Sequence, residues 1–308
     1  MNIHVRVPAT TANLGPGFDA LGLALDLWNE STFVSADEFT VQVTGEGVDK
    51  IPVHRDNLIL RAAQRLAELS GRPLESFQVD CVNRIPFGSG LGSSAAATLT
   101  GLLGANAWLG SPLSNEDILN LATEIEGHSD NVAPALLGGL TVSTMDGDKV
   151  IARSIPIVRA DGQGERTSPL HITVVVPDFH FATREARAAL PKQVTLRDAI
   201  HNISRAVLVA EAFRTSDLDL LGQAMTDALH QPYRLPLIPG AQAAMDAAKS
   251  AGAAATALSG AGPSLIAFSS NAASAVGAEM KRAFEESGIA ARVFHLGTTG
   301  RGAHVESK

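Results

Sequence analysis

The chain has 308 residues, of which 45% are hydrophobic and 18% charged, and its formal net charge is -8. This composition belongs to a folded protein with a sizeable core, long enough for two domains, and it excludes an intrinsically disordered chain. The 24 lysine and arginine residues are fewer than the 32 aspartate and glutamate residues, and they are scattered along the chain. The chain therefore predicts no nucleic-acid partner, whereas a small anion held locally is compatible with the charge.

The chain has one cysteine, which excludes an intramolecular disulfide and a metal site built from several cysteines. Cys81 lies in the alternating run 77–82, which favours packing in a strand over the role of a nucleophile. The first residues contain no apolar signal core, and no apolar run reaches the about 18 residues of a membrane span. We therefore expect a cytoplasmic protein with no membrane partner.

In the first half of the chain, segments in which apolar and polar residues alternate are interspersed with segments in which apolar residues recur with the period of a helix. This order predicts a mixed α/β layer. Ser114 precedes an acidic first turn and Asp117 follows three residues later, a typical start of a helix. The predicted strands cover residues 3–7, 31–35, 39–44, 77–83 and 140–144, and the predicted helices cover residues 57–70, 94–108 and 115–126.

The polar, turn-rich stretch 160–169 predicts an exposed connection, and we place the domain boundary there, with domains 1–160 and 161–308. The order of elements beyond it indicates a two-layer α/β sandwich. The predicted strands cover residues 171–176, 255–258, 264–268 and 291–296, and the predicted helices cover residues 195–214, 218–229, 239–251 and 272–287.

The segment Pro86–Ala96 places glycines at alternate positions, followed by two serines and a run of helix formers. Glycine lets a backbone approach a ligand closely, and the free N–H groups at the start of a helix attract anions. The segment is therefore a candidate phosphate cradle. It is neither a Walker A motif nor a GxGxxG fingerprint, because the glycines fall as GxGxG and no Gly-Lys-Ser/Thr follows. The alternative is an ordinary glycine-rich turn before a helix.

The segment 8–22, directly after the first predicted strand, concentrates hydroxyls, an amide and a carboxylate. Asn13 can donate and accept hydrogen bonds and Asp19 can accept from an ammonium group, which suits recognition of a small polar ligand. The same residues are good turn formers, with Asn13 or a glycine supplying a positive φ. The residues alone favour neither interpretation.

The run 124–139 supplies carboxylates, a histidine and an amide at the end of a predicted helix. Mg²⁺ prefers oxygen ligands that it shares with phosphate and water, so Glu126 and one serine of the glycine loop could hold this ion. The alternative is that Glu124 and Glu126 are solvated helix ends and His128 is a surface charge.

Two further motifs lie in the second half. Arg184 and Arg187 on one segment and Arg234 on another could clamp a carboxylate bidentately, although isolated arginines are usually solvated. The small-residue turn 258–264 could close over phosphates or simply make a tight hairpin.

Together and in this order, these motifs resemble those of the homoserine kinase family of the GHMP kinase superfamily, over nearly the whole chain. The segments 8–25, 86–96, 126–134 and 259–264 match the superfamily, and the segments 128–131, 183–187 and 232–234 narrow the resemblance to homoserine kinases. The resemblance implies an α+β two-domain GHMP kinase fold. Its ATP-binding N-terminal domain would be similar to ribosomal protein S5 domain 2, and its C-terminal domain would be a ferredoxin-like α/β sandwich, with the active site between them.

The resemblance also implies the activity, an ATP-dependent phosphorylation of the L-homoserine hydroxyl to O-phospho-L-homoserine for threonine biosynthesis, with Mg²⁺. Ser94 and Glu126 would hold Mg²⁺, and Thr183 would lie near the transferred group. The residues that would contact homoserine are Asn13, Asp19, His128, Arg187 and Arg234. The residues that would bind ATP are Asn57 at the adenine and Pro86, Phe87, Gly88, Ser89, Gly90, Leu91, Gly92, Ser93, Ser94, Ala95 and Ala96 at the phosphates.

Asn131 departs from the pattern of mevalonate-type members of the superfamily, which carry an aspartate at this position that can act as a base. An amide cannot accept a proton at neutral pH, and the adjacent Asp130 is expected to point elsewhere. We therefore expect no side chain to abstract the hydroxyl proton, because the loose transition state of phosphoryl transfer needs little activation of the nucleophile.

The rival functions are another GHMP kinase that acts on a different alcohol, a catalytically inactive ATP-binding regulator, and an RNA-binding module. Arg187 and Arg234 together with Asp19 suit the charged amino and carboxylate groups of an amino acid, which favours homoserine over another alcohol. The presence of Ser94, Glu126 and Thr183 argues against an inactive scaffold. The negative net charge argues against RNA binding. The sequence leaves open whether the chain forms a homodimer.

Overall fold

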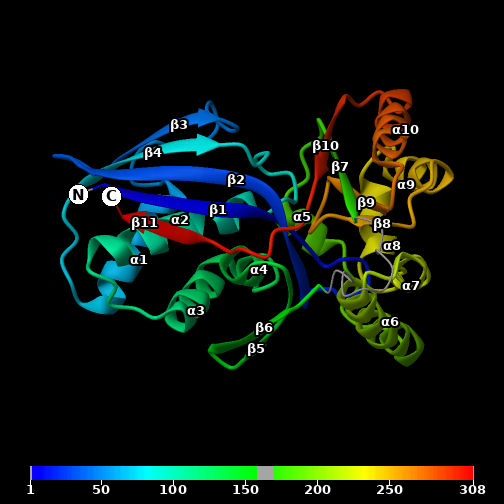
Figure 1. The fold of residues 1–308 in the computed structure, drawn as a ribbon, viewed down its shortest axis with the longest axis horizontal. Coiled ribbons are helices and arrows are strands. Elements are labelled where there is room, and N and C mark those ends of the chain that lie inside the picture. Colours follow the sequence, from blue (N-terminus) through cyan, green and yellow to red (C-terminus); the bar gives the residue numbers. More distant parts are fainter. Residues whose placement is uncertain (1, 158–169, 308) are drawn as a thin grey trace, which may run out of the picture.

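The computed structural model describes residues 2–157 and 170–307, and it is built around two β-sheets (Figure 1). The predicted connection 160–169 and the predicted boundary at 160/161 lie outside the described residues. The mixed α and β architecture in two parts confirms the predicted fold class.

The first sheet has the strand order β11-β1-β2-β4-β3, and the β5–β6 hairpin continues from β2. All its pairs are antiparallel except the parallel pair β3–β4. Its strands are β1 (Ile3–Ala12), β2 (Leu21–Ser35), β3 (Thr40–Gly45), β4 (Phe77–Asn83), β5 (Leu140–Asp146), β6 (Lys149–Ile155) and β11 (His304–Ser307).

Helices α1 (Leu58–Ser70), α2 (Ser93–Trp108), α3 (Asn115–Glu126) and α4 (Val132–Leu137) belong to this sheet, and α2 is the central one. Buried residues occur all round α2, because it contacts β1 on one side and α1, α3 and α4 on the others. Its N-terminus, at Ser93, therefore has a fixed position relative to the sheet.

The second sheet is antiparallel with the order β10-β7-β9-β8. In strand β7, neighbouring side chains point to opposite faces of the sheet. Val175 belongs to a hydrophobic cluster with residues of α9 and α10, and Val174 belongs to another cluster with residues of α6 and α7. Helices thus cover both faces, so this half has a third layer that the predicted two-layer sandwich did not include. The elements are β7 (His171–Pro177), α5 (Thr183–Ala188), α6 (Leu196–Thr215), α7 (Leu218–Ala224), α8 (Gln231–Arg234), a 3-10 turn (Leu235–Leu237), α9 (Ala241–Ser250), β8 (Ala255–Leu258), β9 (Leu265–Ser269), α10 (Ala273–Glu286) and β10 (Ala291–Leu296).

Most predicted elements are confirmed to within a few residues, and α3 matches exactly, with Ser114 and Asp117 forming the expected capping box. The first two strands are longer than predicted. β1 continues to Ala12 and β2 begins at Leu21, with a bulge after Pro8, because the two strands pair with each other along this whole length. The sequence prediction missed α4, β6, α5, α8 and β11.

The predicted helix 218–229 is wrong in its last part, since α7 ends at Ala224. The cause is the carboxylate of Asp227, which accepts hydrogen bonds from the backbone N–H groups of Leu229 (2.9 Å), His230 (3.0 Å) and Gln231 (2.6 Å). A side chain that captures nearby N–H groups competes with the helical hydrogen bonds.

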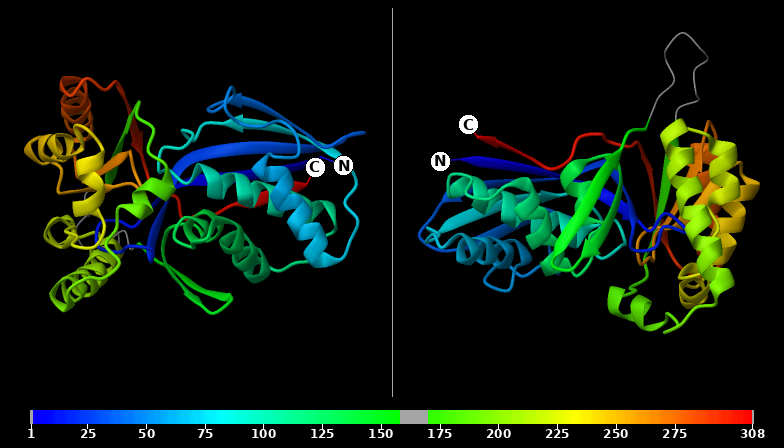
Figure 2. Two further views of the ribbon diagram at one scale, coloured as in Figure 1. Left: turned by 180° about the vertical axis from the view of Figure 1, so that it is seen from behind. Right: turned by 90° about the horizontal axis from the view of Figure 1, so that it is seen from below.

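Strand β11 returns from the second half of the chain to the first sheet, where it pairs with β1 from Ile3–Ser307 to Arg6–His304. Both ends of the chain therefore lie side by side at one edge of that sheet (Figures 1 and 2). The division into domains 1–160 and 161–308 stays a prediction, and β11 is the element that crosses it.

Cys81 is buried in β4, and burial raises the pKa of its thiol to about 11, which confirms a packing role. None of the helices in residues 2–157 and 170–307 is both long and apolar enough to cross a membrane.

The packing of α2 on β2 predicts a sensitive position at Gly104. A Cβ atom there would lie 2.1 Å from the ring of Phe33, which is fully buried and packs edge-on against Phe77. We expect Gly104→Ala to lower the free energy of unfolding by about 1–2 kcal/mol, because overpacking outweighs the gain in helix propensity of about 1 kcal/mol. Urea unfolding measures this change. The control is Gly297→Ala, whose Cβ meets no atom within 4 Å, and an equal effect of both substitutions would contradict the packing argument.

Candidate active site

A cavity of about 210 Å³ lies between the two halves of the chain. It brings together residues that are far apart in the sequence and that four separate motifs supply. The predicted residues in its wall are Asn13, Asp19, Phe87, Gly88, Gly90, Gly92, Ser93, Ser94, His128, Asn131, Thr183, Arg187 and Arg234. The residues that the prediction did not include are Asp130, His180, Phe181, Ala182, Gly260 and Ala261.

The glycine loop ends at Gly92, directly before the first residue of α2. Gly88, Gly90 and Gly92 have φ values of 64°, 85° and 70°, a region that favours glycine. The N–H groups in the first turn of α2 have no partner within the helix, so they are free for an anion. Pro86, Ser89, Leu91, Ala95 and Ala96 are buried and do not line the cavity, so only their backbones could meet a ligand.

The turn 259–264 between β8 and β9 supports the glycine loop from the other half of the chain. The Ser259 hydroxyl donates to the carbonyl of Gly90 (2.8 Å), and the backbone N–H of Ser264 donates to the carbonyl of Ser89 (3.2 Å). A Cβ atom at Gly90 would lie 2.3 Å from the carbonyl oxygen of Ser259. Only glycine fits this approach, so the turn braces the loop.

Glu126, the last residue of α3, faces the start of α2. Its two carboxylate oxygens accept hydrogen bonds from Ser94 (2.5 Å) and Thr98 (2.6 Å), which lie one turn apart on α2. In the described part of the chain, no group of three or more His, Cys, Asp or Glu side chains could hold a metal ion. One carboxylate and one hydroxyl would therefore need oxygen ligands from elsewhere to complete a magnesium shell.

His128 and Asp130 form an ion pair, with 2.9 Å between Nδ1 and Oδ1. Burial alone lowers the pKa of His128, but the hydrogen bond and charge of Asp130, together with the charge of Glu126, raise the pKa above its usual value. The expectation that Asp130 points elsewhere is wrong, because this side chain lies in the cavity wall. The irregular backbone between α3 and α4 allows neighbouring side chains to face one cavity.

Asn131, at the start of α4, accepts a hydrogen bond from the hydroxyl of Thr10 (2.9 Å) through its Oδ1 atom. Its amide thus links the end of β1 to the segment that follows α3. Thr183 is the first residue of α5 and lies in the cavity wall, as Asn131 does.

Asn13 has the positive φ of 70° that turn chemistry predicts. Its Nδ2 donates to the carbonyl of Gly260 (2.8 Å), and its Oδ1 accepts from the N–H of Asp19 (2.9 Å). Both polar groups of this amide are therefore bonded within the protein. Of the two interpretations left open by the sequence, the structure displays the turn, which orients Asp19 at the cavity.

Asp19 and Arg187 pair with each other across the cavity. Two parallel hydrogen bonds of 2.9 Å join the guanidinium to the carboxylate, and they raise the pKa of Arg187. The two groups are predicted to bind opposite ends of a ligand, so a ligand would have to rearrange this pair.

Arg234 is different, because it is only 1% exposed and forms no ion pair with any residue that the structure describes. Its guanidinium lies 5.1 Å from the ring centroid of Phe18 and donates to the carbonyl of Ala186 (3.2 Å). Burial and the charge of Arg187 lower its pKa to about 10, so it is still protonated at neutral pH. A buried cation without a counter-ion at the wall of a cavity is a strong site for an anion.

The sequence prediction missed the side chains that hold Arg234. His230, fully buried, lies 3.3 Å from the guanidinium through Nδ1 and 2.7 Å from the carbonyl of Gly15 through Nε2. Burial lowers the pKa of His230, so the neutral ring donates to Gly15 and accepts from Arg234. Asn202, which the prediction also missed, holds the preceding loop and not Arg234 itself, since it donates to the carbonyl of Pro16 (3.1 Å). A lone histidine and an amide in helical patterns carry no signal that could have found them.

Asn57 lies in a second cavity of about 300 Å³, which shares Phe87, Ser93 and Ser94 with the first. Its Nδ2 donates to the carbonyl of Pro52 (2.6 Å), and its Oδ1 caps α1 at the N–H of Ile59 (2.8 Å). Both groups are engaged, so Asn57 shapes the wall of this cavity.

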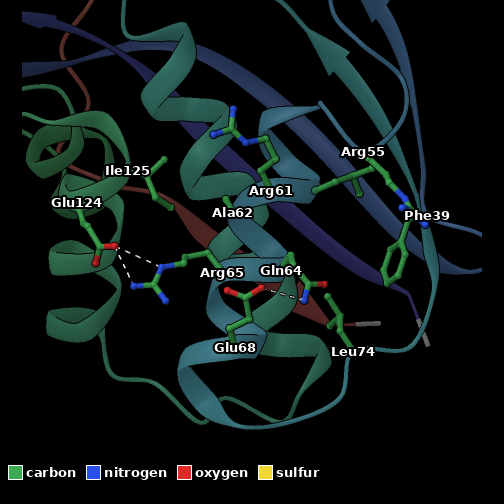
Figure 3. Close-up of a pocket in the computed structure, with 11 residues that line it drawn as sticks. Phe39, Arg55, Arg61, Ala62, Gln64, Arg65, Glu68, Leu74, Glu124 and Ile125 are labelled. Carbon is green, nitrogen blue, oxygen red and sulfur yellow. Dashed lines mark hydrogen bonds and ion pairs between the residues drawn. The ribbon is translucent and has the colours of Figure 1, made fainter.

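A larger cavity, of about 650 Å³, lies elsewhere, over α1 (Figure 3). Four of its polar side chains form two pairs, Arg65 with Glu124 (2.9 Å) and Gln64 with Glu68 (3.3 Å). It contains none of the predicted site residues. Glu124 is thus a partly solvated helix residue, as one alternative predicted, whereas Glu126 faces α2.

Comparisons with known proteins agree with this geometry. Residues 57–139 match the family described as GHMP kinases N terminal domain, and residues 209–286 match the family described as GHMP kinases C terminal. The homoserine kinase of Moorella thermoacetica is 46% identical over 98% of this chain and 99% of its own length. That of Carboxydothermus hydrogenoformans is 41% identical over 98% of this chain and 96% of its own length.

Solved structures show the same similarity. The crystal structure of homoserine kinase from Cytophaga hutchinsonii superposes with a TM-score of 0.85 at 31% identity, over 99% of this chain and 97% of that one. A mevalonate kinase structure, at 16% identity and a TM-score of 0.70 over 97% of this chain and 99% of that one, shares the fold. On the strength of relatives that match from end to end, the chain belongs to the homoserine kinase family of the GHMP kinases.

Proposed function

We propose that the protein transfers the γ-phosphoryl group of ATP to the hydroxyl of L-homoserine, giving O-phospho-L-homoserine for threonine biosynthesis. The single observation that carries this proposal is Arg234, a buried cation without a counter-ion that faces the same cavity as the glycine loop. A carboxylate-bearing substrate would supply the missing negative charge beside a phosphate-binding loop. The relatives named homoserine kinases support the same substrate.

The nucleotide would occupy both cavities. The phosphates would lie against the glycine loop and the first turn of α2, where free N–H groups and the positive end of the helix dipole favour an anion. The adenine would lie in the neighbouring cavity, whose wall includes Ile51, Ile59 and Ile85. The shared residues Phe87, Ser93 and Ser94 would lie beside the ribose, which links these two parts of ATP.

Ser94 and Glu126 fit a magnesium ion, because their oxygens already lie 2.5 Å apart and Thr98 holds the second carboxylate oxygen. When bound there, Mg²⁺ would offset the negative charge of the phosphates. Ser94 would turn from Glu126 toward the ion, whereas Thr98 would keep the carboxylate in place.

The amino-acid head of homoserine would bind on the opposite wall. Its carboxylate would meet Arg234 and Arg187, and its ammonium group would meet Asp19. The zwitterion would thus exchange the ion pair Asp19–Arg187 for two pairs with opposite charges of its own, so that no charge is left unpaired. An uncharged alcohol could not make this exchange.

We propose that no side chain acts as a base before the attack. Asn131 carries an amide, which cannot accept a proton at neutral pH, and the carboxylate of Asp130 is engaged in its ion pair with His128. The proton of the substrate hydroxyl would pass to the transferred phosphoryl group. Positioning by Thr183 and the loop would lower the barrier, which suits a loose transition state.

The substrate assignment predicts a specific defect in Arg234→Gln. The unchanged protein should release ADP with L-homoserine and Mg²⁺ and not with mevalonate, galactose or shikimate. The variant should raise KM for L-homoserine at least about tenfold, because a charged hydrogen bond contributes about 1.5–3 kcal/mol. For L-homoserine amide, which has no carboxylate, the same substitution should raise KM far less.

The matched control is Arg184→Gln, since Arg184 is exposed on α5 and does not line the cavity. It should keep the KM of the unchanged protein. If L-homoserine gave no Mg²⁺-dependent turnover, or if one of the other alcohols were turned over better, the substrate would be wrong and only the superfamily would stand. An equal loss for homoserine and its amide would reject the pairing of Arg234 with the carboxylate.

The proposed metal ligand Glu126 and the proposed absence of a base at Asn131 predict opposite effects on turnover when each residue is replaced. Glu126→Gln should lower kcat by about a hundredfold or more and shift the Mg²⁺ dependence to higher concentrations, because a carboxylate ligand is lost. Asn131→Ala should keep kcat within about tenfold, because no proton transfer depends on it. A magnesium titration of steady-state rates measures both. A collapse of turnover in Asn131→Ala by many orders of magnitude would sink the mechanism without a base.

The raised pKa of His128 predicts a pH-dependent contribution to stability. The unfolded pKa is about 6.5, so the ion pair with Asp130 stabilises the fold fully below that pH, and this contribution is lost as the pH rises through the higher folded pKa. The difference in unfolding free energy between the unchanged protein and His128→Gln should therefore shrink from about pH 6 to pH 9. Urea unfolding at several pH values measures it. A difference that grows with pH would contradict the assignment, and His230 contributes equally to both proteins.

A further inference from the structure

The aromatic ring of Phe18 lies next to both arginines of the candidate site. The guanidinium of Arg234 lies 5.1 Å from the ring centroid, and that of Arg187 lies 5.9 Å from it. Both distances are within the about 6 Å at which the negative face of an aromatic ring attracts a cation. One ring therefore contacts the two cations that are proposed to bind the carboxylate of the substrate.

The two cations need such a support, because like charges repel each other. The charge of Arg187 contributes to the lowered pKa of Arg234. Arg187 has a counter-ion in Asp19, whereas Arg234 has only neutral partners in the part of the chain that the structure describes. The electron-rich face of Phe18 is a contact that the two arginines share, and it attracts both of them without adding a net charge.

The second half of the chain fixes the position of the Phe18 ring. His230 stacks on it, with 5.2 Å between the ring centroids and 26° between the ring planes. The backbone before Phe18 is held by the hydrogen bond between His230 and the carbonyl of Gly15 (2.7 Å). The ring thus has a defined place relative to α8, which begins directly after His230 and ends with Arg234.

We propose that Phe18 is a positioning residue for substrate binding, which holds Arg187 and Arg234 at a spacing that one carboxylate can bridge. This inference rests on the proposed function, since it concerns the carboxylate of homoserine. Phe18 does not line the cavity, so it acts through the two arginines and not by contact with the substrate. Its support matters most when Asp19 turns from Arg187 to the ammonium group, because the ring then holds Arg187 together with the bound carboxylate.

Fluorination of the Phe18 ring tests this role with little change in the shape of the side chain. Fluorine withdraws electron density from the face of the ring, so mono-, di- and trifluorinated phenylalanine at this position should attract the guanidiniums progressively less. KM for L-homoserine should rise stepwise, to about tenfold for the trifluorinated ring, while kcat and KM for ATP stay within about twofold. KM for L-homoserine amide should change far less. Steady-state kinetics measures these constants.

The matched control is the same fluorinated series at Phe213. This ring packs edge-on against Phe268, with 5.3 Å between the centroids, and no cation of residues 2–157 and 170–307 lies over it. Fluorination there should leave KM for L-homoserine unchanged. A merely structural role of Phe18 would give the same flat result, so a flat series at Phe18 would overturn the inference.

A second measurement does not depend on the substrate. If the ring holds Arg234 in the free protein, Phe18→Leu should shift the unfolding equilibrium constant at least about threefold less in the Arg234→Gln background than in the unchanged protein. Urea unfolding of the four proteins measures this coupling. Equal shifts in both backgrounds would overturn the inference, whichever alcohol is phosphorylated.

Failure of the proposed function gives a different result from failure of this role. If L-homoserine gave no turnover while the two substitutions were coupled in unfolding, the substrate would be wrong, and Phe18 would position the arginines for another anion. If L-homoserine were turned over and Arg234→Gln raised its KM, but the fluorinated series at Phe18 stayed flat, the proposed function would stand and the positioning role would be overturned.

Discussion

The segment of residues 10–19 is fixed from both halves of the chain, and the candidate site depends on this constraint. From the first half, the N–H of Thr10 donates to Leu91 in the glycine loop (3.1 Å). From the second half, Gly260 donates to the carbonyl of Ala12 (3.1 Å) and His230 binds the carbonyl of Gly15 (2.7 Å). The segment joins β1 to β2, so it carries the geometry of the first sheet to the arginines of the second half.

The site is also a balance of charges, of which Arg187 and Asp19 are partly exposed and Arg234 is buried. Arg187 has a carboxylate partner in Asp19, His128 has one in Asp130, and only Arg234 is left with neutral partners in the described chain. An unpaired buried cation costs several kcal/mol of stability, and a ligand that brings a carboxylate relieves this cost. Neutral His230 and the ring of Phe18 keep the guanidinium in place without neutralising it.

Much of the fold could be predicted from the sequence, because its signals are local. The capping box at Ser114 and the periodicity of residues 57–70 and 94–108 depend on neighbours within a few residues. The end of α7 could not be predicted, because Asp227 is held by Asn202, 25 residues away. Strand β11 was missed for the same reason, since it pairs with β1, almost the whole chain away.

The sequence alone determined most of the chemical inventory of the site: a glycine loop before a helix, Glu126, His128 and two arginines. It could do so because each motif is a short run whose chemistry does not depend on the rest of the chain. Only the tertiary structure decided how these groups are used. It engaged both ends of the Asn13 and Asn57 amides, paired Asp19 with Arg187, brought Asp130 into the wall, and left Arg234 without a counter-ion. Hydrogen bonds and ion pairs between distant segments form only when packing brings them together, and no local pattern records which pairs will form.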